Sequence, residues 1–581
     1  MFRICGIVFV LVLFAGSSST VFGATYTVTK TTDTSDGTCD ADCSLREAVV
    51  AANASVDNDT IAFSALFNAP QTITLGGTEI VFANNGTLTI NGPGANRLTI
   101  SGNNASRIFT SGANVVVNIN NLRFTGGNGA GATNTGRGGA IYNVGGTMVV
   151  SNSIITGNAA ANGGAFNNAA STGPAVNGNL TIINCAVTNN TSTSSGGAMQ
   201  NFSTSFLTII NSTISGNTSN LAGLAGGGIQ ANGTVSISNS TISGNNAPAG
   251  TGGGGIIFNG VGLTLNNVTI SGNTAANGAG GLHKSTATLN ANVRNTIISG
   301  NTGAAANPDA LGPFNSQGNN IIAIVGTSTG WVASDLQNVN PLLGPVGFYG
   351  GLGNTYPLLT TSPALNAGQN CVTDLTCAVG NPPAAITTDQ RGAVRPFATT
   401  VDIGAFESST AYVAILPDAA ANQPYNQVLT SAVGAFTYSQ SGGTLPGGVT
   451  VNTGATTATI GGTPMPTGTF NFGVNLTNGA NSALVNYRLT VTGASAPATL
   501  SGRVLRSNGT AIGKVIVTLT EPGGGTRRTL TGSLGYYGFD NLAVGQTYQV
   551  TVNSKAYTFM PSTQPVVAAN GVNELNFTAQ P

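Results

Sequence analysis

Acidic side chains, which would supply the acid, base or calcium ligands of a polysaccharide-cleaving enzyme, are missing from a long central stretch of this sequence. No Asp or Glu occurs between Ile80 and Pro308. Glycosidases need paired carboxylates, and a calcium-dependent lyase needs clustered carboxylates beside a basic residue. The charged side chains of this stretch are Arg97, Arg107, Arg123, Arg137, Lys284 and Arg294. We therefore predict no enzyme activity and assign no catalytic residue, with a polysaccharide lyase or hydrolase as the alternative, since an arginine serves as base in some lyases.

Candidates for metal chemistry are few. His283 is the single histidine, which excludes a site built from several histidines, and its neighbour Lys284 indicates a solvated turn. Aspartates gather near the N-terminus at Asp33, Asp36, Asp40, Asp42, Asp57 and Asp59. Their spacing is not that of an EF-hand loop. We predict no cofactor and no metal site, and a structural calcium ion at the acidic stretch stays open as the alternative.

The cysteines indicate an oxidising compartment. Cys39 and Cys43 are close in sequence, as are Cys371 and Cys377, so each pair can close a small disulfide loop. Cys185 occupies a repeat position that elsewhere holds Ser or Thr, and we expect a free, buried thiol there.

Residues 1–23 have the pattern of a secretory signal. Arg3 precedes an apolar run from Ile4 to Phe14, and cleavage after Gly23 would start the mature chain at Ala24. A membrane anchor is the rival interpretation, but the run is short for a bilayer. The formal net charge of zero provides no basic patch for nucleic acid or anionic lipid. We predict a secreted or bacterial cell-surface protein with no transmembrane segment in the mature chain and no nucleic-acid partner.

A seven-residue pattern that starts at Asn211 recurs every 28 residues and predicts a solenoid. Each period also holds a Gly-Gly step and an alternating apolar run, so three short strands would form one coil. Stacking would align an inner aliphatic column of Ile214, Ile242, Ile270 and Ile298. It would also align a corner ladder of amides from Asn217, Asn245, Asn273 and Asn301. The predicted fold class is all-β, a right-handed three-sided parallel β-helix.

Both ends of the solenoid are expected to need covers, because open ends expose unpaired strand edges. Ser44 and Glu47 have the spacing of a capping box before a short amphipathic helix, and Arg46 should pair with a nearby Asp. After the repeats, charge is concentrated in one segment. We interpret its charged residues as ion pairs that lock the terminal turn: Asp389, Arg391, Arg395, Asp402 and Glu407.

Several segments resemble known families. Gly-Gly-Ala-Ile-Tyr-Asn at residues 138–143 is similar to the repeats of polymorphic outer-membrane proteins, which implies the pectate-lyase-like β-helix. Residues 43–48, Cys-Ser-Leu-Arg-Glu-Ala, resemble the bacterial domain named for that motif (CSLREA). Residues 362–368 and 389–407 resemble the closing segment of secreted β-helix proteins classed by their choice of anchor.

The C-terminal third loses the repeat and resembles two accessory modules. Gly461-Gly462-Thr463-Pro464 is typical of immunoglobulin-like domains of bacterial surface proteins, and Gly535-Tyr536-Tyr537-Gly538-Phe539 of the carboxypeptidase regulatory-like domain, a noncatalytic transthyretin-like sandwich. The predicted domains are 1–23 signal peptide, 24–75 N-terminal cap, 76–407 β-helix with closing segment, 408–494 Ig-like sandwich and 495–581 carboxypeptidase regulatory-like sandwich.

These observations favour a non-catalytic, adhesin-like or scaffold protein that presents a β-helix rod to extracellular ligands. Its uncharged surface, rich in Asn, Thr and Ser, would contact extracellular glycans or surface proteins. A carbohydrate-binding protein is the alternative, although few aromatic side chains in the repeats are available to stack on sugars.

Overall fold

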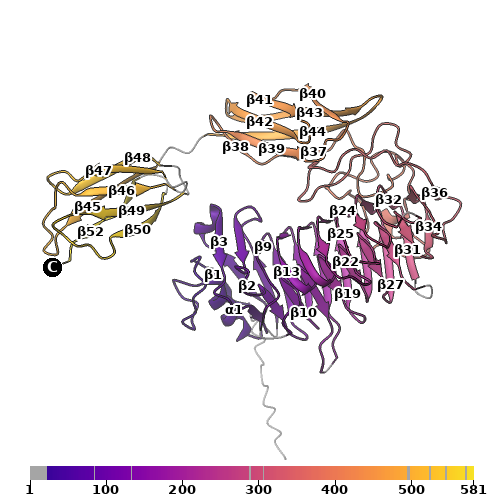
Figure 1. Cartoon of the computed structure of the whole chain (residues 1–581), viewed down its shortest axis with the longest axis horizontal. Helices are drawn as coiled ribbons and strands as arrows, with labels where there is room; N and C mark the ends of the chain where they lie inside the picture. The colour runs from indigo at the N-terminus through magenta and orange to yellow at the C-terminus, as the bar shows by residue number, and fades with distance from the viewer. Residues whose placement is uncertain are drawn as a thin grey trace, which may run out of the picture.

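A computed structural model describes residues 23–83, 86–131, 134–173, 175–286, 290–304, 306–493, 498–521, 525–542, 546–568 and 572–580. The predicted signal peptide, apart from Gly23, lies outside the described residues. The chain is mostly β: a parallel solenoid of about nine coils is followed by two small β-sheet domains (Figure 1).

Three long parallel sheets form the walls of the solenoid. Sheet A consists of β1 (Thr25–Val28), β2 (Asp59–Phe63), β5 (Thr87–Asn91), β8 (Val116–Asn120), β11 (Thr147–Ser151), β15 (Asn179–Ile183), β19 (Phe206–Ile210), β23 (Thr234–Ser238), β27 (Gly262–Asn266), β31 (Asn290–Arg294) and β34 (Asn315–Gly318). Sheet B consists of β3 (Gln71–Thr74), β6 (Leu98–Ser101), β9 (Arg123–Thr125), β12 (Ile154–Thr156), β16 (Ala186–Thr188), β20 (Thr213–Ser215), β24 (Thr241–Ser243), β28 (Thr269–Ser271), β32 (Ile297–Ser299), β35 (Ile321–Ile322) and β36 (Leu336–Gln337). Sheet C consists of β4 (Ile80–Phe82), β7 (Phe109–Ser111), β10 (Ile141–Val144), β14 (Phe166–Ala169), β18 (Met199–Asn201), β22 (Ile229–Ala231), β26 (Ile256–Phe258), β30 (Leu282–Lys284) and β33 (Ala310–Leu311).

A fourth, shorter sheet was not predicted from the sequence. Sheet D joins β13 (Ala159–Asn162), β17 (Thr191–Ser195), β21 (Thr218–Ser219), β25 (Asn246–Ala247) and β29 (Thr274–Ala275). These segments directly follow a corner asparagine and carry few apolar residues, so no hydrophobic pattern marks them. They become strands because stacking in register lets their backbones pair with the coils on either side.

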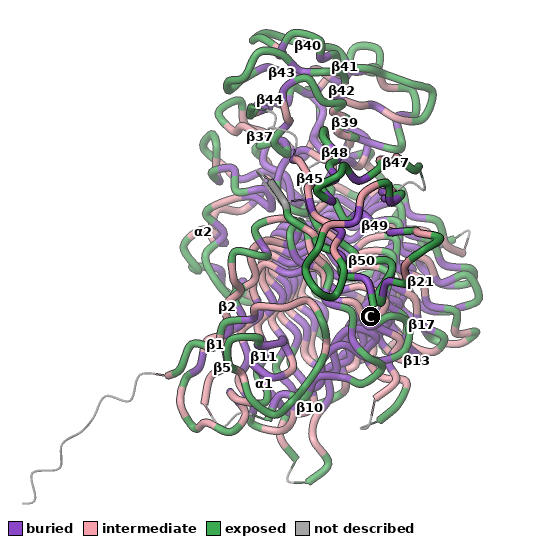
Figure 2. The backbone as a smooth tube through the Cα atoms, turned by 90° about the vertical axis from the view of Figure 1, so that its left-hand side faces the viewer, coloured by how far each residue is buried: buried purple, intermediate pink, exposed green. Residues whose placement is uncertain are grey.

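The 28-residue period sets the register between coils. Ile214 pairs with Ile242, Ile242 with Ile270 and Ile270 with Ile298. All four side chains are fully buried and belong to one continuous core. Figure 2 shows buried residues concentrated inside the stacked coils and exposed ones in the loops around them. The handedness of the coil stays a prediction.

The N-terminal end of the core is covered by α1 (Leu45–Asn53), which buries Leu45, Ala48, Val49 and Ala52, and by a short 3-10 helix (Ala65–Asn68). Ser44 is the N-cap of α1: its Oγ accepts the N–H of Glu47 at 3.1 Å, and Glu47 Oε2 accepts the N–H of Ser44 at 2.6 Å. The Cys39–Cys43 disulfide closes the loop before α1.

We expected the segment after the repeats to cover the C-terminal end of the solenoid, and this prediction is wrong. It lies along the outer face of sheet B, where Gln390 bonds to Thr213 and Thr241, which are one coil apart. The end itself is covered earlier in the chain by Trp331, which stacks on Phe314 with ring centres 5.0 Å apart. This closing segment, residues 340–407, contains α2 (Cys371–Asp374) and the Cys371–Cys377 disulfide.

Two β-sheet domains follow. The first packs the sheet of β37 (Val413–Ile415), β38 (Ala419–Ala420), β44 (Asn481–Thr492), β43 (Gly468–Asn478) and β40 (Thr437–Gly443) against β39 (Tyr425–Thr430), β42 (Ala458–Met465) and β41 (Gly447–Thr453). Its core is continuous with the closing segment through Tyr349 and Phe406. The second contains β45 (Ala498–Leu505), β48 (Tyr536–Leu542), β51 (Val572–Glu574) and β52 (Phe577–Thr578), and β46 (Ile516–Thr520), β47 (Thr526–Leu530), β49 (Thr547–Asn553) and β50 (Thr563–Val567), around a core of its own. No helix among the described residues is long and apolar enough to cross a membrane.

Candidate functional site

The corner asparagines form a buried ladder between sheets B and D. Asn217 Nδ2 donates to Asn245 Oδ1 at 2.8 Å, Asn245 to Asn273 at 2.9 Å, and Asn273 to Asn301 at 2.9 Å. The backbone N–H of each asparagine donates to the same oxygen, and Asn245 Nδ2 also reaches the carbonyl of Ile214 at 2.8 Å. Since these amides already bond within the ladder, they are structural and offer little to a ligand.

The ladder ends on Asp309, which sequence reasoning missed. Each amide donates to the oxygen of the next, so the last one, Asn301, needs an acceptor oxygen from outside the ladder. Asp309 Oδ1 accepts the backbone N–H and Nδ2 of Asn301 at 3.0 and 2.9 Å, and Oδ2 accepts the N–H of Ile324 at 2.9 Å. Asp335 does the same for Asn320. Burial raises the pKa of Asp309. The available signal was that Asp309 is the first acid after the repeats.

Two of the predicted ion pairs hold the closing segment together. Arg391 Nη2 lies 2.7 Å from Asp389 Oδ2, and Arg395 Nε lies 3.0 Å from Glu407 Oε2, all with buried side chains. The predicted ion pair is wrong for Asp402, which makes no ion pair within the described part of the chain.

Instead, the Asp402 carboxylate accepts backbone N–H groups, from Asn366 and from Ser408, each at 2.6 Å. Burial, followed by the charge of Glu407, raises the pKa of Asp402 to about 6. A perturbed carboxyl of this kind is a common mark of an active site. Here both of its oxygens are occupied by backbone, which is the bonding of a structural anchor.

The N-terminal aspartates are dispersed rather than gathered around one point. Arg46 Nε and Nη2 bond both oxygens of Asp33 at 2.9 and 2.8 Å, and Lys30 Nζ lies 3.1 Å from Asp42. Asp59 accepts the N–H of Ala24. Throughout the described ranges, no three His, Cys, Asp or Glu side chains are placed to hold a metal ion.

The arginines considered as lyase bases lie in different surroundings. Arg294 is 3% exposed and donates to the carbonyl of Val379 at 2.8 Å, beneath the closing segment. Arg123 donates to the carbonyl of Ala95 at 3.2 Å. Burial lowers the pKa of both guanidinium groups from their ordinary value. Arg137 lies over the ring of Phe202, with its guanidinium carbon 4.7 Å from the ring centre.

Arg107 is fully buried and forms an ion pair of 2.5 Å with Glu79, whose carboxylate also accepts a hydrogen bond from Thr110. This carboxylate lies just outside the acid-free stretch. The pair is shielded from solvent, because both side chains are buried.

The turn predicted at His283 and Lys284 is wrong. Both residues belong to β30, in register with Ile257 and Phe258, and are only 9% and 6% exposed. Lys284 Nζ donates to the carbonyl of Pro313 at 2.6 Å. Burial lowers the pKa of both side chains. The Gly281-Leu282 step already indicated that the repeat continues here, and the turn was predicted only from the polar residue types that follow it.

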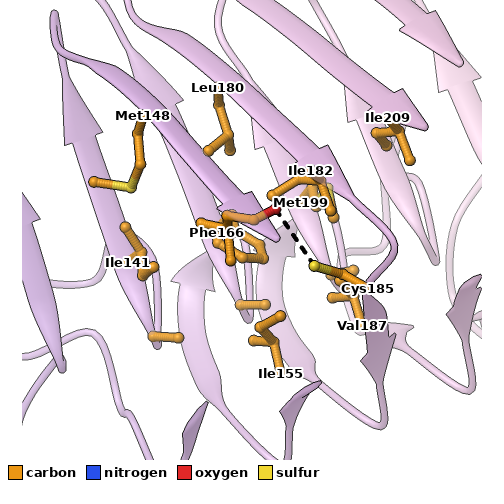
Figure 3. Close-up of a cluster of buried hydrophobic side chains, with 14 of the residues drawn as sticks. Ile141, Met148, Ile155, Phe166, Leu180, Ile182, Cys185, Val187, Met199 and Ile209 are labelled. Atoms are coloured by element: carbon orange, nitrogen blue, oxygen red, sulfur yellow. Dashed lines mark hydrogen bonds between the residues drawn. The ribbon is translucent and has the colours of Figure 1, made fainter. Parts of the chain in front are cut away.

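Cys185 is the free thiol within the described residues, and it is buried. Figure 3 shows it among Phe166, Ile182 and Val187, with its sulfur directed toward a backbone carbonyl. Burial raises the pKa of the thiol to about 12, so the reactive thiolate is scarce at neutral pH.

A groove separates the first coils from the closing segment and the first β-domain. It has a volume of about 510 Å³, within the range of small-ligand sites, roughly 300–1,000 Å³. Its lining is uncharged and comprises Gly94, Ala95, Asn96, Asn121, Asn152, Ile154 and Asn184 from the solenoid, with Phe348, Gly351, Leu352, Ile415, Leu416 and Pro417 opposite.

Three of the groove asparagines, Asn121, Asn152 and Asn184, belong to a second column, at the corner between sheets A and B. Its members have φ between 48° and 60°, a conformation that Asn tolerates better than most residues: Asn121, Asn152, Asn184, Asn211, Asn239, Asn267 and Asn295. The asparagine at the first position of each seven-residue pattern was the sequence signal for this column.

The closing segment covers one half of this column and leaves the other half to the groove. Asn239 Nδ2 donates to the carbonyl of Thr388 at 2.8 Å, and Asn295 Nδ2 donates to that of Gln369 at 3.0 Å. In the groove, Asn184 bonds to Asn152 at 2.6 Å, and both are partly exposed. The column thus presents a row of amides able to bond neutral oxygen acceptors.

Two family models match segments of the C-terminal third of the chain. Residues 407–492 match the family described as Putative Ig domain. Residues 499–580 match the carboxypeptidase regulatory-like domain. Both agree with the resemblances drawn from the sequence. The CSLREA and choice-of-anchor resemblances stay predictions. No curated protein matches the chain.

Solved structures match parts of the chain at low similarity. A single-residue variant of BcpA, the major pilin subunit of Bacillus cereus, is 10% identical over 28% of this chain and 67% of its own, with a TM-score of 0.17. A C-terminal fragment of the pilus adhesin SpaC from Lactobacillus rhamnosus GG is 8% identical over 21% and 84%, with a TM-score of 0.12. The endo-fucoidan hydrolase MfFcnA9 is 18% identical over 28% and 33%, with a TM-score of 0.14. We draw no functional conclusion from similarity at this level.

Proposed function

We propose that this chain is an extracellular, non-catalytic protein of the adhesin or scaffold type that binds neutral glycans in the groove between solenoid and closing segment. The lining of that groove carries the proposal: amides at one wall face apolar side chains at the other. Sugars offer the matching chemistry, since their hydroxyls bond amides and their C–H faces pack on apolar groups. The two disulfides support an extracellular setting.

Binding of the chain from Ala24 onward to an array of neutral and acidic glycans tests this proposal. Ile154→Arg puts a charge into the groove, whereas Val149→Arg puts the same charge on sheet A of the same coil, also at a partly exposed aliphatic position. We expect neutral glycans to bind, with affinity at least about tenfold weaker in the first variant (about 1.4 kcal/mol) and unchanged in the second. Equal loss in both variants, or no glycan binding at all, would contradict the proposal.

The absence of catalysis is tested separately, with pectin, alginate and fucoidan as substrates and with or without calcium. We expect no turnover, because the carboxylates beside the solenoid bond to internal partners. Turnover that disappears in Arg123→Ala or Arg137→Ala, with the fold intact, would replace the scaffold proposal by a lyase. Turnover lost only in Asp402→Asn would place an active site in the closing segment.

A further inference from the structure

The first residue of β2, Asp59, is a buried carboxylate with half of its bonding capacity unused. Its side chain is 1% exposed. Oδ1 accepts the backbone N–H of Ala24 at 2.8 Å, while the buried Oδ2 has no hydrogen-bond partner in the described part of the chain. None of the ion pairs among the described residues includes Asp59. A buried carboxylate without a cation partner is costly.

The backbone of Ala24 is held beside this carboxylate by strand pairing. Ala24 precedes β1, which is parallel to β2, and the carbonyl of Ala24 accepts the N–H of Thr60 at 2.9 Å. In an uncleaved chain the Ala24 nitrogen is an amide with one hydrogen and no charge. It can serve only one carboxylate oxygen, which is the arrangement observed. Gly23 passes so close to the carbonyl of Asn58 that a side chain there would overlap it.

We propose that the Gly23–Ala24 bond is a processing site, and that its cleavage completes the N-terminal cap by delivering the α-ammonium of Ala24 to the carboxylate of Asp59. This inference depends on the predicted signal peptide and not on the groove. Hydrolysis by a signal peptidase adds one water: its oxygen joins the Gly23 carbonyl carbon to form a carboxylate that leaves with residues 1–23. The Ala24 nitrogen gains hydrogens and becomes a cation with three N–H donors, enough for both oxygens of Asp59.

The charges around this position favour the ammonium. Asp59 bonds to the Ala24 nitrogen, and a second carboxylate, Asp57, lies near Tyr26 in β1 together with Asp59. Their proximity is apparent at Tyr26, whose pKa is raised by burial and then by the charges of Asp59 and Asp57. Cleavage thereby converts an unfavourable buried charge into a charge-assisted pair that fastens β1 to β2, the first contact of the solenoid.

The test uses the exported protein and two chains that begin at Ala24 or retain Gly23. Intact mass should show Ala24 as the first residue after export. In the Ala24 chain, the terminal amine should titrate above its usual range, about 7.7–8.0, and react at neutral pH with an amine-modifying reagent at least tenfold more slowly than in Asp59→Asn. The matched variant Asp57→Asn should change this rate far less.

Two results would overturn the proposal. One is cleavage at another bond, which removes the processing site. The other is an amine of the Ala24 chain that reacts equally fast in the parent and in Asp59→Asn, which removes the ion pair. If Asp59→Asn does not fold, the chain that retains Gly23 decides: with Asp59 intact it should melt at a lower temperature than the Ala24 chain, and equal melting contradicts the inference.

Discussion

Single residues along the solenoid act at the places where the repeat stops. An asparagine ladder is directional, because each amide donates forward and accepts from behind. Asp309 ends the asparagine ladder with a carboxylate that only accepts, and Asp335 accepts from Asn320 in the same way. Two of the acids nearest the acid-free repeats are therefore bonded to the scaffold and are not free for catalysis.

Asp309→Asn tests this role of the ladder's terminal acceptor. The new amide keeps one acceptor oxygen but turns an NH₂ toward either Asn301 or the N–H of Ile324. A buried donor facing a donor should lower the free energy of unfolding by about 1–3 kcal/mol. Chemical denaturation measures this, and the exposed Asp418→Asn serves as control. A variant as stable as the control would show that this position does not need a carboxylate with two acceptor oxygens.

At the scale of elements, the closing segment is an irregular chain fastened to a regular face. It hydrogen-bonds to a column of threonines on sheet B. Gln390 bonds to Thr213 and Thr241, and the N–H of Ala405 donates to Thr269. Asp402 anchors the turn by accepting backbone N–H groups. Regular columns thus provide evenly spaced hydroxyls for a segment that has no period of its own.

Asp402 gives this segment a pH dependence with a defined sign. Its pKa in the folded chain is about 6, above the ordinary value, so the folded state binds more protons than the unfolded state between about pH 4 and 6. This residue's contribution therefore makes the segment less stable as pH rises through that window. Hydrogen exchange of residues 362–408 at pH 4.5 and 6.5 measures it, and Asp402→Asn should remove this part of the slope. An identical slope in that variant would assign the effect to another group.

At the scale of the whole molecule, the chain consists of two parts that do not share a hydrophobic core. Solenoid, closing segment and first β-domain are continuous: Tyr349 bonds to Tyr438 at 3.1 Å, and Tyr487 donates to the carbonyl of Phe348 at 2.9 Å. The last β-domain has a separate core and lies apart from the solenoid in Figure 1. The groove is formed only where the first part folds back on itself.

Truncation distinguishes these two parts. A chain that ends at residue 493 lacks the last domain and should melt at the parent temperature, because no shared core is lost. A chain that ends at residue 407 exposes apolar residues such as Tyr349 and Phe406 and should melt several degrees lower. Differential scanning calorimetry of both chains checks this. A lower melting temperature for the first truncation would mean that the last domain supports the solenoid.

The sequence by itself determined what recurs. A 28-residue spacing places Ile242 between Ile214 and Ile270, and neighbouring cysteines close short loops, because these contacts depend only on the covalent chain and its period. Tertiary structure alone decided that the closing segment lies along sheet B, that Lys284 is buried, and that Asn152 lines a groove. Those outcomes depend on how aperiodic segments fit a distant surface, and no local pattern of residue types records that fit.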